Sequence, residues 1–336
     1  MTKAAQRPVM HDVARLAGVS HQTVSRVLNA HPHVSAETRE RVIVAMRQLN
    51  YRPNAFARGL VTNRSRRIGV MSFDSRMFGP GSTLRAIEHA ARAAGYGVAV
   101  VGTTDLSVGD INDAVESLDT QSVDGIIVIA PTQAAVRALG TLPRGLPIVA
   151  LEAEYRPEIP VVSIDQFEGA RLATQHLLDL GHETVWHVGG PSDWREALLR
   201  VDGWRATLAD ASKRTPPLQE GDWSPRSGYA AGQELARRDD VTAVFAANDQ
   251  MALGVIHALA QAGRRVPEDV SVVGFDDIPE AEFFLPGLTT VRQDFDEVGR
   301  LGLDLLVRIL DDSATEHRER PTIAPQLVVR ASTTPL

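Results

Sequence analysis

Residues 18–29, with the sequence GVSHQTVSRVLN, contain a run of polar side chains and no carboxylate. These side chains suit contact with a nucleic acid, because Gln can bond an adenine through two hydrogen bonds and Arg can bind guanine or a phosphate. In a helical conformation, one face of the segment would present His21, Gln22, Ser25, Arg26 and Asn29. The alternative is a small helical bundle whose polar face only contacts water.

A second group of polar residues comes at the ends of apolar segments farther along the chain. Such segments end at Glu152, at Asn248–Asp249 and at Asp276–Asp277. With the guanidinium of Arg200 and the indole of Trp223, these groups suit a sugar, which needs hydrogen-bond partners for its hydroxyls and an aromatic face for its CH groups. A strand-end carboxylate can equally cap a helix or order a loop, and the residue types leave both interpretations open.

The charge of the chain is unevenly distributed. Residues 1–67 contain 12 Lys and Arg against three Asp and Glu, a net charge of +9, so the remainder carries −16 because the total is −7. A small basic segment on a large acidic body indicates a polyanionic partner for that segment alone. An exposed basic tail without a partner would have the same composition.

Three short helices are predicted in residues 8–53. The first spans residues 10–17 and ends at Gly18 in a left-handed cap, the second follows the capping residue Ser20, and the third starts near Ser35 and ends before Pro53. The expected buried side chains are Val13, Leu16 and Ala17, then Val24, Val27 and Leu28, then Val42, Met46 and Leu49. Two helices joined by a short turn that contains Gly form a helix-turn-helix unit, whose second helix enters the major groove.

From Ile68 onward, short apolar strands alternate with helices. The first series of predicted strands covers residues 68–73, 96–102, 124–130 and 146–152, and the second covers 161–165, 185–190, 242–249 and 270–277. The expected fold is α/β: a helix-turn-helix head and a body of two doubly wound lobes. Ligands of such sheets bind beyond the carboxyl ends of the strands, which predicts a cleft between the lobes.

Composition and missing motifs exclude several classes of protein. The 336 residues include no Cys, which excludes disulfides and thiolate metal sites. No apolar run reaches the roughly 20 residues of a membrane span, and the first residues do not read as a secretion signal, so we expect a cytoplasmic protein that does not contact membranes. Nucleotide-binding loops, zinc-protease helices and nucleophile elbows are absent from the sequence, and neither a cofactor nor a metal nor a catalytic residue is expected.

The segments DVARLAGVSHQTVSRVLN and VSAETRERVIVAMRQLNYRPN resemble the signature head of the lactose/galactose repressor family of bacterial transcription regulators. The resemblance implies that residues 54–67 are a hinge and linker, in which a helix forms on operator DNA and Leu60 enters the minor groove. The DNA-contacting residues that it implies are His11, Ser20, His21, Gln22, Thr23, Ser25, Arg26, Asn29, His33, Thr38, Asn54, Ala57 and Leu60. This chain departs from the family at Val9, where a capping Thr is common, and at His11 and His21, where the lactose-responsive branch has tyrosines.

The body also resembles this family, whose body has the layout of periplasmic sugar-binding proteins. The similarity to the lactose-responsive branch is densest in EGDWS, ANDQMALG, DVSVVGFDD and LTTVRQDF. It implies an effector site formed by Met77, Phe78, Pro80, Glu152, Arg200, Trp223, Asn248, Asp276, Gln293 and Phe295. Glu152 replaces an Asp of that branch and Ile129 replaces an Asn, so one polar contact is longer and another is missing.

The resemblance implies a sugar-responsive repressor that binds a pseudo-palindromic operator as a homodimer. We expect the head at residues 8–53 and the body at 68–336, with an N-lobe of about 68–162 and 293–320 and a C-lobe of about 163–292 and 321–336. No leucine heptad follows VVRASTTPL, which favours a dimer over a tetramer. The expected inducer is a β-galactoside or related glycoside. The alternatives are a regulator whose ligand strengthens DNA binding and, in another class, a sugar-binding transport component.

Overall fold

The computed structural model describes residues 8–28, 31–51, 64–73, 77–103, 108–139, 146–153, 159–311 and 320–336. Contacts divide the chain into two compact units, Met1–Ser65 and Arg66–Leu336, and each is described by itself. The predicted contacts at Asn29, Asn54, Ala57 and Leu60, and most of the expected hinge, lie outside the described residues.

The first unit contains the three predicted helices, α1 (Met10–Ala17), α2 (His21–Leu28) and α3 (Ala36–Gln48). Gly18 ends α1 with φ 64°, and the hydroxyl of Ser20 accepts the N–H of Thr23 at 3.1 Å, as predicted for the two ends of the turn. Val9 provides no side-chain cap, but its own N–H donates to the Asp12 carboxylate at 2.9 Å. Gly18 and Ser20 thus fix the two ends of the turn between α1 and α2.

The core of this unit corrects one prediction. Leu16 is 49% exposed, whereas Ala14 is buried beside Val13 and Ala17. In a helix of only eight residues, the small side chain of Ala14 allows a close approach to α2 and α3, and Leu16 falls on the outer edge of the apolar face. The predicted inward positions of α2 and α3 otherwise pack into one cluster.

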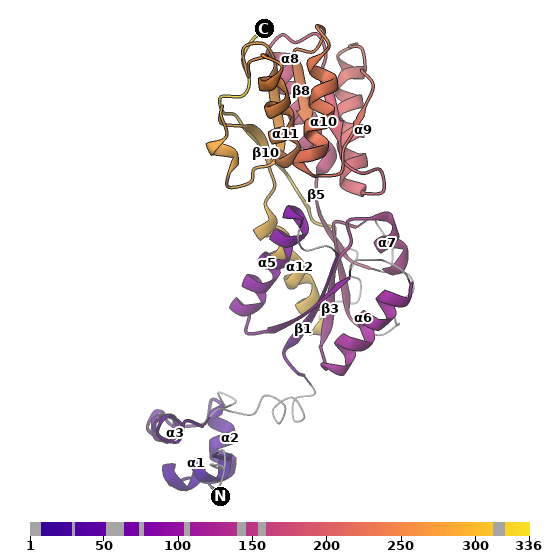
Figure 1. Ribbon diagram of the computed structural model, residues 1–336. Coiled ribbons are helices and arrows are strands. Elements are labelled where there is room, and N and C mark those ends of the chain that lie inside the picture. The colour runs from indigo at the N-terminus through magenta and orange to yellow at the C-terminus, as the bar shows by residue number, and fades with distance from the viewer. Residues whose placement is uncertain are drawn as a thin grey trace, which may run out of the picture. The chain divides into compact units, whose positions relative to one another are not determined.

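The second unit is built on two six-stranded sheets with helices on both faces (Figure 1). The first sheet has the order β11-β5-β4-β3-β1-β2 and is entirely parallel. Its strands are β1 (Arg67–Phe73), β2 (Gly97–Thr103), β3 (Gly125–Ile129), β4 (Ile148–Leu151), β5 (Val161–Ile164) and β11 (Thr322–Ile323). Helices α5 (Phe78–Ala93) and α12 (Phe295–Leu310) cover one face, and α6 (Val108–Thr120) and α7 (Gln133–Leu139) cover the other.

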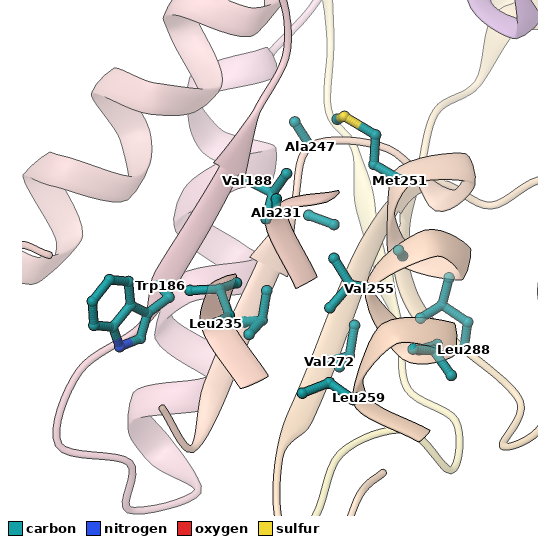
Figure 2. Packing of buried hydrophobic residues seen from close by; sticks show 14 of the residues in the cluster. Trp186, Val188, Ala231, Leu235, Ala247, Met251, Val255, Leu259, Val272 and Leu288 are labelled. Atoms are coloured by element: carbon teal, nitrogen blue, oxygen red, sulfur yellow. The ribbon is translucent and has the colours of Figure 1, made fainter. Parts of the chain in front are cut away.

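The second sheet has the order β12-β10-β9-β8-β6-β7, and only β12 runs antiparallel to its neighbour. Its strands are β6 (Trp186–Gly189), β7 (Gln219–Glu220), β8 (Ala243–Ala246), β9 (Ser271–Asp276), β10 (Thr289–Arg292) and β12 (Gln326–Val328). One face packs on α8 (Gln166–Asp179) and α9 (Arg195–Asp210), and the other on α10 (Pro225–Ala236) and α11 (Asp249–Gln261), with the short helix η1 (Ala281–Phe283) nearby. In Figure 2, Leu235, Val255 and Leu259 of these helices lie against Val188 and Val272 of the sheet.

The chain passes between the two lobes three times: between β5 and α8, between β10 and α12, and between β11 and β12. The strand predicted at residues 161–165 was assigned to the second series, which is wrong, because β5 pairs with β4 in the first sheet. An apolar pattern indicates a buried strand but not its sheet, which the crossing connections decide. Likewise β11 pairs with β5, a few residues beyond the expected N-lobe limit of about 320.

Candidate effector cavity and DNA-contacting head

A cavity of about 150 Å³ lies between the two lobes of the second unit, at the carboxyl ends of the strands. One water needs about 10–15 Å³ of such volume, so there is room for a molecule of monosaccharide size. All ten residues expected at the effector site line it: Met77, Phe78, Pro80, Glu152, Arg200, Trp223, Asn248, Asp276, Gln293 and Phe295. The other lining residues are Gly79, Thr83, Ile129, Trp194, Glu196 and Gln250.

Polar side chains of the C-lobe and of the crossover after β10 form a closed ring of contacts at the cavity. Arg200 donates from Nε to Gln166 Oε1 at 2.9 Å, Gln166 donates from Nε2 to Gln293 at 2.7 Å, and Gln293 donates from Nε2 to Asp276 at 2.6 Å. Asp276 Oδ1 lies 3.7 Å from Arg200 Nη2 and closes the ring. Because Arg can only donate and a carboxylate can only accept, the two amides have one consistent orientation. The ring therefore fixes four polar groups before any ligand binds.

Arg200 is held by more than this ring. It is 4% exposed, donates to the carbonyl of Ala247 and stacks 3.8 Å over the ring of Phe275. Burial lowers the pKa of its guanidinium, and the charge of Asp276 opposes that shift. Such a cation is preorganised to donate to a ligand oxygen without moving.

The indole of Trp223 forms an aromatic wall whose position depends on a neighbouring amide. Asn248 caps α11 by accepting the N–H of Met251 at 2.8 Å, and its Nδ2 donates to the carbonyl of Trp223 at 3.0 Å. Trp194 meets Trp223 edge to face at 5.6 Å between ring centroids. Asn248 thus orients Trp223 as well as lining the cavity.

Three of the lining residues have an uncommon backbone conformation. The φ angles are 56° at Glu152, 71° at Trp223 and 105° at Asp276. Residues other than Gly rarely adopt positive φ, and such conformations concentrate at ligand sites where the surrounding structure holds them. Their convergence on one cavity favours a functional role for it.

The cavity contains more carboxyl groups than cations. Burial raises the pKa of Glu152 to about 7, of Glu196 to about 8 and of Asp276 to about 6. The charge of Glu152 also raises the pKa of Glu196, whereas Arg200 lowers the pKa of all three groups. Their protonation therefore changes near neutral pH.

Contacts between the lobes surround the cavity. Met77 and Phe78 of the N-lobe pack on the apolar cluster of the C-lobe. Within the N-lobe, Phe78 contacts Phe295 at 5.8 Å between ring centroids. Backbone hydrogen bonds also cross between the lobes, from Gln133 N–H to Asp193 O at 3.1 Å and from Arg195 N–H to Pro131 O at 3.0 Å. The lobes are joined around the cavity by contacts that an opening motion would break.

Two strand-end carboxylates have structural roles instead. Asp249 is fully buried and accepts from the Ile278 N–H at 2.8 Å and the Thr290 hydroxyl at 2.6 Å. Asp277 binds Arg292 and Arg330 at 2.6 and 2.7 Å. Asp249 and Asp277 therefore order the surrounding structure, whereas Glu152 and Asp276 line the cavity.

Sequence reasoning missed Glu196 and Gln166. Glu196 lies one helical turn before Arg200 on α9, so the i, i+4 spacing could have placed both on the cavity side. Gln166 is the first residue of α8, and no sequence signal distinguishes it from an ordinary helix start. Its role follows only from the crossover that brings it to Gln293.

In the head, most expected DNA-contacting side chains are accessible. His11, His21, Gln22, Arg26 and His33 are exposed, and Thr23 and Ser25 are half-buried. The hydroxyl of Ser20 caps α2, and Thr38 takes part in the cap of α3 through Ser35 at 2.9 Å. Ser20 and Thr38 therefore also order helix N-termini, where backbone N–H groups suit a phosphate.

Comparison with known proteins shows similarity along nearly the whole chain. Residues 9–54 match the bacterial regulatory proteins of the lacI family, and residues 174–333 match the periplasmic binding protein-like domain. The chain is 36% identical to the lactose operon repressor of Escherichia coli (strain K12) over 334 residues, which cover 98% of this chain and 91% of that protein. It is 32% identical to the HTH-type transcriptional repressor PurR of Haemophilus influenzae (strain PittEE), over 96% of this chain and 97% of that protein.

A solved structure is similar over the same extent. The lac repressor dimer bound to operator and the anti-inducer ONPF superposes with a TM-score of 0.86 and 35% identity, covering 98% of this chain and 100% of that chain. None of the described helices is long and apolar enough to cross a membrane. The similarity includes the head as well as both lobes of the body.

Proposed function

We propose that this chain, which belongs to the lacI family of bacterial regulatory proteins, binds a pseudo-palindromic operator as a homodimer and is released by a small sugar. It is a transcriptional repressor of that family, not an enzyme. The proposed inducer is a β-galactoside or related glycoside. The observation that carries this proposal is the cavity in which the ring from Arg200 to Asp276 meets the indole of Trp223. Fixed polar groups beside an aromatic face are what a sugar requires.

The side chains of the cavity have different proposed roles. Arg200 and Asp276 bond the hydroxyls of the sugar, and Trp223 stacks on its CH face. Gln293 holds Asp276 in place through its hydrogen bond. Phe78 and Phe295 close the N-lobe side. Glu152 and Asn248 contribute the remaining polar contacts, and Met77 and Pro80 contribute apolar surface.

The head is the proposed operator-binding segment, at residues 8–53, and residues 54–67 are the proposed hinge. His21 and Gln22 are exposed at the N-terminal end of α2, the part of a recognition helix that contacts base edges. The excess of basic side chains in this region supports binding to the phosphate backbone. The solved lac repressor dimer with bound operator, similar along almost the whole chain, supports the same arrangement here.

An apolar surface supports the proposed dimer. Phe283 and Leu285, on the segment of η1, are 76% and 91% exposed. Large apolar side chains that are exposed two residues apart in the sequence suit burial against a second copy of the chain. Their replacement by Ser should weaken self-association.

Coupling between the two sites follows from the arrangement of the body. A ligand that prefers one relative position of the lobes shifts the population towards it. In the proposed mechanism, the sugar changes the positions of the N-lobes in the dimer, separates the two hinges and lowers operator affinity. By linkage, the operator must weaken sugar binding by the same factor.

The proposal can be tested with an operator selected from random duplex DNA by the full-length protein. A gel shift is then run with a panel of galactosides, glucosides, xylosides and phosphorylated sugars. Release of the operator by a sugar is the expected result. Tighter operator binding in the presence of a ligand would overturn induction and favour the alternative, a regulator whose ligand strengthens DNA binding.

A further inference from the structure

The carboxyl groups of the cavity specify its ligand further. Among the described residues that line it, Arg200 is the single cation, whereas Glu152, Glu196 and Asp276 are acids. Asp276 is the partner of Arg200, at 3.7 Å. Glu152 and Glu196 remain as two acidic groups. Arg195, which is not among the lining residues, lowers the pKa of both, so the two acids share one further cation outside the cavity wall.

Glu152 presents an unused acceptor to the cavity. It is 4% exposed, and its Oε1 accepts the N–H of Ile164 at 3.1 Å. Its Oε2 is buried and has no hydrogen-bond partner within the described part of the chain. A buried carboxylate oxygen without a donor is costly, so a ligand that supplies a donor there gains affinity.

Glu196 and Glu152 line the same cavity, and the charge of Glu152 raises the pKa of Glu196. It comes from α9 and Glu152 comes from the end of β4, so the two acids belong to different lobes. An ammonium group has three donors and no acceptor, whereas a hydroxyl brings one donor and two acceptor lone pairs. A surplus of acceptors with negative charge therefore suits an ammonium better than a hydroxyl.

We propose that the effector of this cavity is a sugar that carries a protonated amine, and that its ammonium group binds between the carboxyl groups of Glu152 and Glu196. The proposal rests on the proposed sugar site and names the class of sugar. Arg200 and Trp223 keep their proposed contacts with the sugar. Because the ammonium contacts one acid from each lobe, it also draws the lobes together.

Calorimetry on the full-length protein tests this proposal with matched pairs of sugars. The probes are galactosamine, glucosamine and a galactose whose primary hydroxyl is replaced by an amine, each compared with its neutral parent hexose. We expect at least one amino sugar to bind about tenfold or more tightly than its parent, because hydrogen bonds to charged groups are the strong ones. Glu196→Gln should bring this ratio close to one, because the charge that favours the ammonium over a hydroxyl is removed.

Two controls separate recognition from a general change in the fold. Glu183→Gln changes an exposed acid outside the cavity and should leave the ratio as it is. Glu152→Gln should lower the ratio as Glu196→Gln does, whereas a structural defect would weaken both members of a pair equally.

The pH dependence provides a second readout. Glu152 and Glu196 are faced by Arg195, Arg200 and Asp276. An ammonium that binds two acids must displace the protons that these acids carry near neutral pH. The affinity of the galactose whose primary hydroxyl is replaced by an amine should therefore rise from about pH 6 to about pH 8, and protons should be released on binding. The neutral parent should show a smaller rise, because it has no ammonium to displace the protons of Glu152 and Glu196.

The outcomes distinguish this proposal from the proposed function. If neutral hexoses bind and every amino sugar binds no better than its parent, the ammonium site is wrong and the sugar-responsive repressor stands. If none of the amino or neutral sugars binds, the sugar site itself is wrong and the ammonium proposal falls with it.

Discussion

Arg200 connects several groups around the cavity. Its contacts reach Gln166 at the start of α8, Ala247 at the end of β8 and Asp276 at the end of β9. Gln166 in turn donates to Gln293, which lies at a crossover between the lobes. A ligand that binds Arg200 is therefore connected through Gln166 to this crossover. A single side chain thus links ligand binding to the relative position of the lobes.

We expect Arg200→Ala to abolish the effector response and to leave operator binding intact. Removing one partner of a buried pair should also lower the free energy of unfolding by about 3–5 kcal/mol. Operator binding with and without sugar, together with thermal unfolding, measures both effects. Arg205→Ala, an exposed position on the same helix, should change neither. Induction retained in Arg200→Ala would place the effector elsewhere.

The acids of the cavity predict a dependence of stability on pH. Because the pKa of Glu196 in the folded protein is about 8, above the usual value, the folded state binds more protons than the unfolded chain between these two values. This stabilisation is complete below the unfolded pKa and is lost as the pH rises through about 8. We expect Glu196→Gln to reduce the loss of stability between about pH 7 and pH 9 by on the order of 1–2 kcal/mol.

Denaturant unfolding of the effector-free protein at several pH values measures this dependence. Buried His187, whose pKa is lowered to about 3, favours folding as the pH rises, but its contribution is complete above its unfolded pKa. The window above about pH 7 therefore isolates the acids. An identical slope for the parent protein and Glu196→Gln would contradict the assigned environment of Glu196.

At the scale of elements, close helix packing sets the shape of the C-lobe. Gly254 on α11 faces α10, and a Cβ at this position would lie 2.1 Å from the carbonyl oxygen of Pro225. Since the obstacle is backbone, the helices must separate to accept any side chain. This packing holds the N-terminus of α11, and hence Asn248, at the cavity.

Gly254→Ala should therefore destabilise the protein by about 1–3 kcal/mol, although Ala favours a helix by about 1 kcal/mol over Gly. The measurement is the midpoint of denaturant unfolding. Gly102→Ala is the matched control, because a Cβ there has no atom within 4 Å. Equal stability of the two variants would show that α10 and α11 can separate without cost.

The second helix of the head gives another prediction at this scale. Gln22 is exposed on α2, so Gln22→Ala should weaken the selected operator by about 1–3 kcal/mol and leave nonspecific binding unchanged. Binding titrations with the selected operator and with random duplex measure both. Gln48→Ala, at the end of α3, is the control. An equal loss on random DNA would reduce Gln22 to a contact with the backbone.

Sequence patterns predicted the elements better than their spatial neighbours. The helix boundaries around Gly18 and Ser20 were predictable because caps are local, and the strands were predictable from apolar runs. The sheet that contains β5 was not predictable, because its pairing depends on crossovers distant in sequence. The same reason hid Gln166, whose partner Gln293 is 127 residues away.

For the candidate site, the residue types suggested sugar chemistry, and the family resemblance supplied most positions. Neither indicated that Glu152 would retain an oxygen without a hydrogen-bond partner among the described residues, or that Glu196 would line the same cavity. Such properties arise from packing between elements of the two lobes. Exposure also depends on packing, which is why Leu16 was misplaced.

The proposed coupling between the cavity and the operator is a property of the whole molecule. The family assignment establishes a transcriptional repressor, and the cavity provides a place where a small molecule can alter the contacts between the lobes. A repressor without such coupling would be constitutive. The proposed coupling is therefore a difference in free energy between two states of the same protein.

The most direct test measures the affinity of the releasing sugar by calorimetry, for the full-length protein alone and for its complex with the selected operator. We expect the operator to weaken sugar binding about 5- to 150-fold, by the same factor by which the sugar weakens operator binding. Equal sugar affinity in the two forms, or tighter binding to the operator complex, would contradict it.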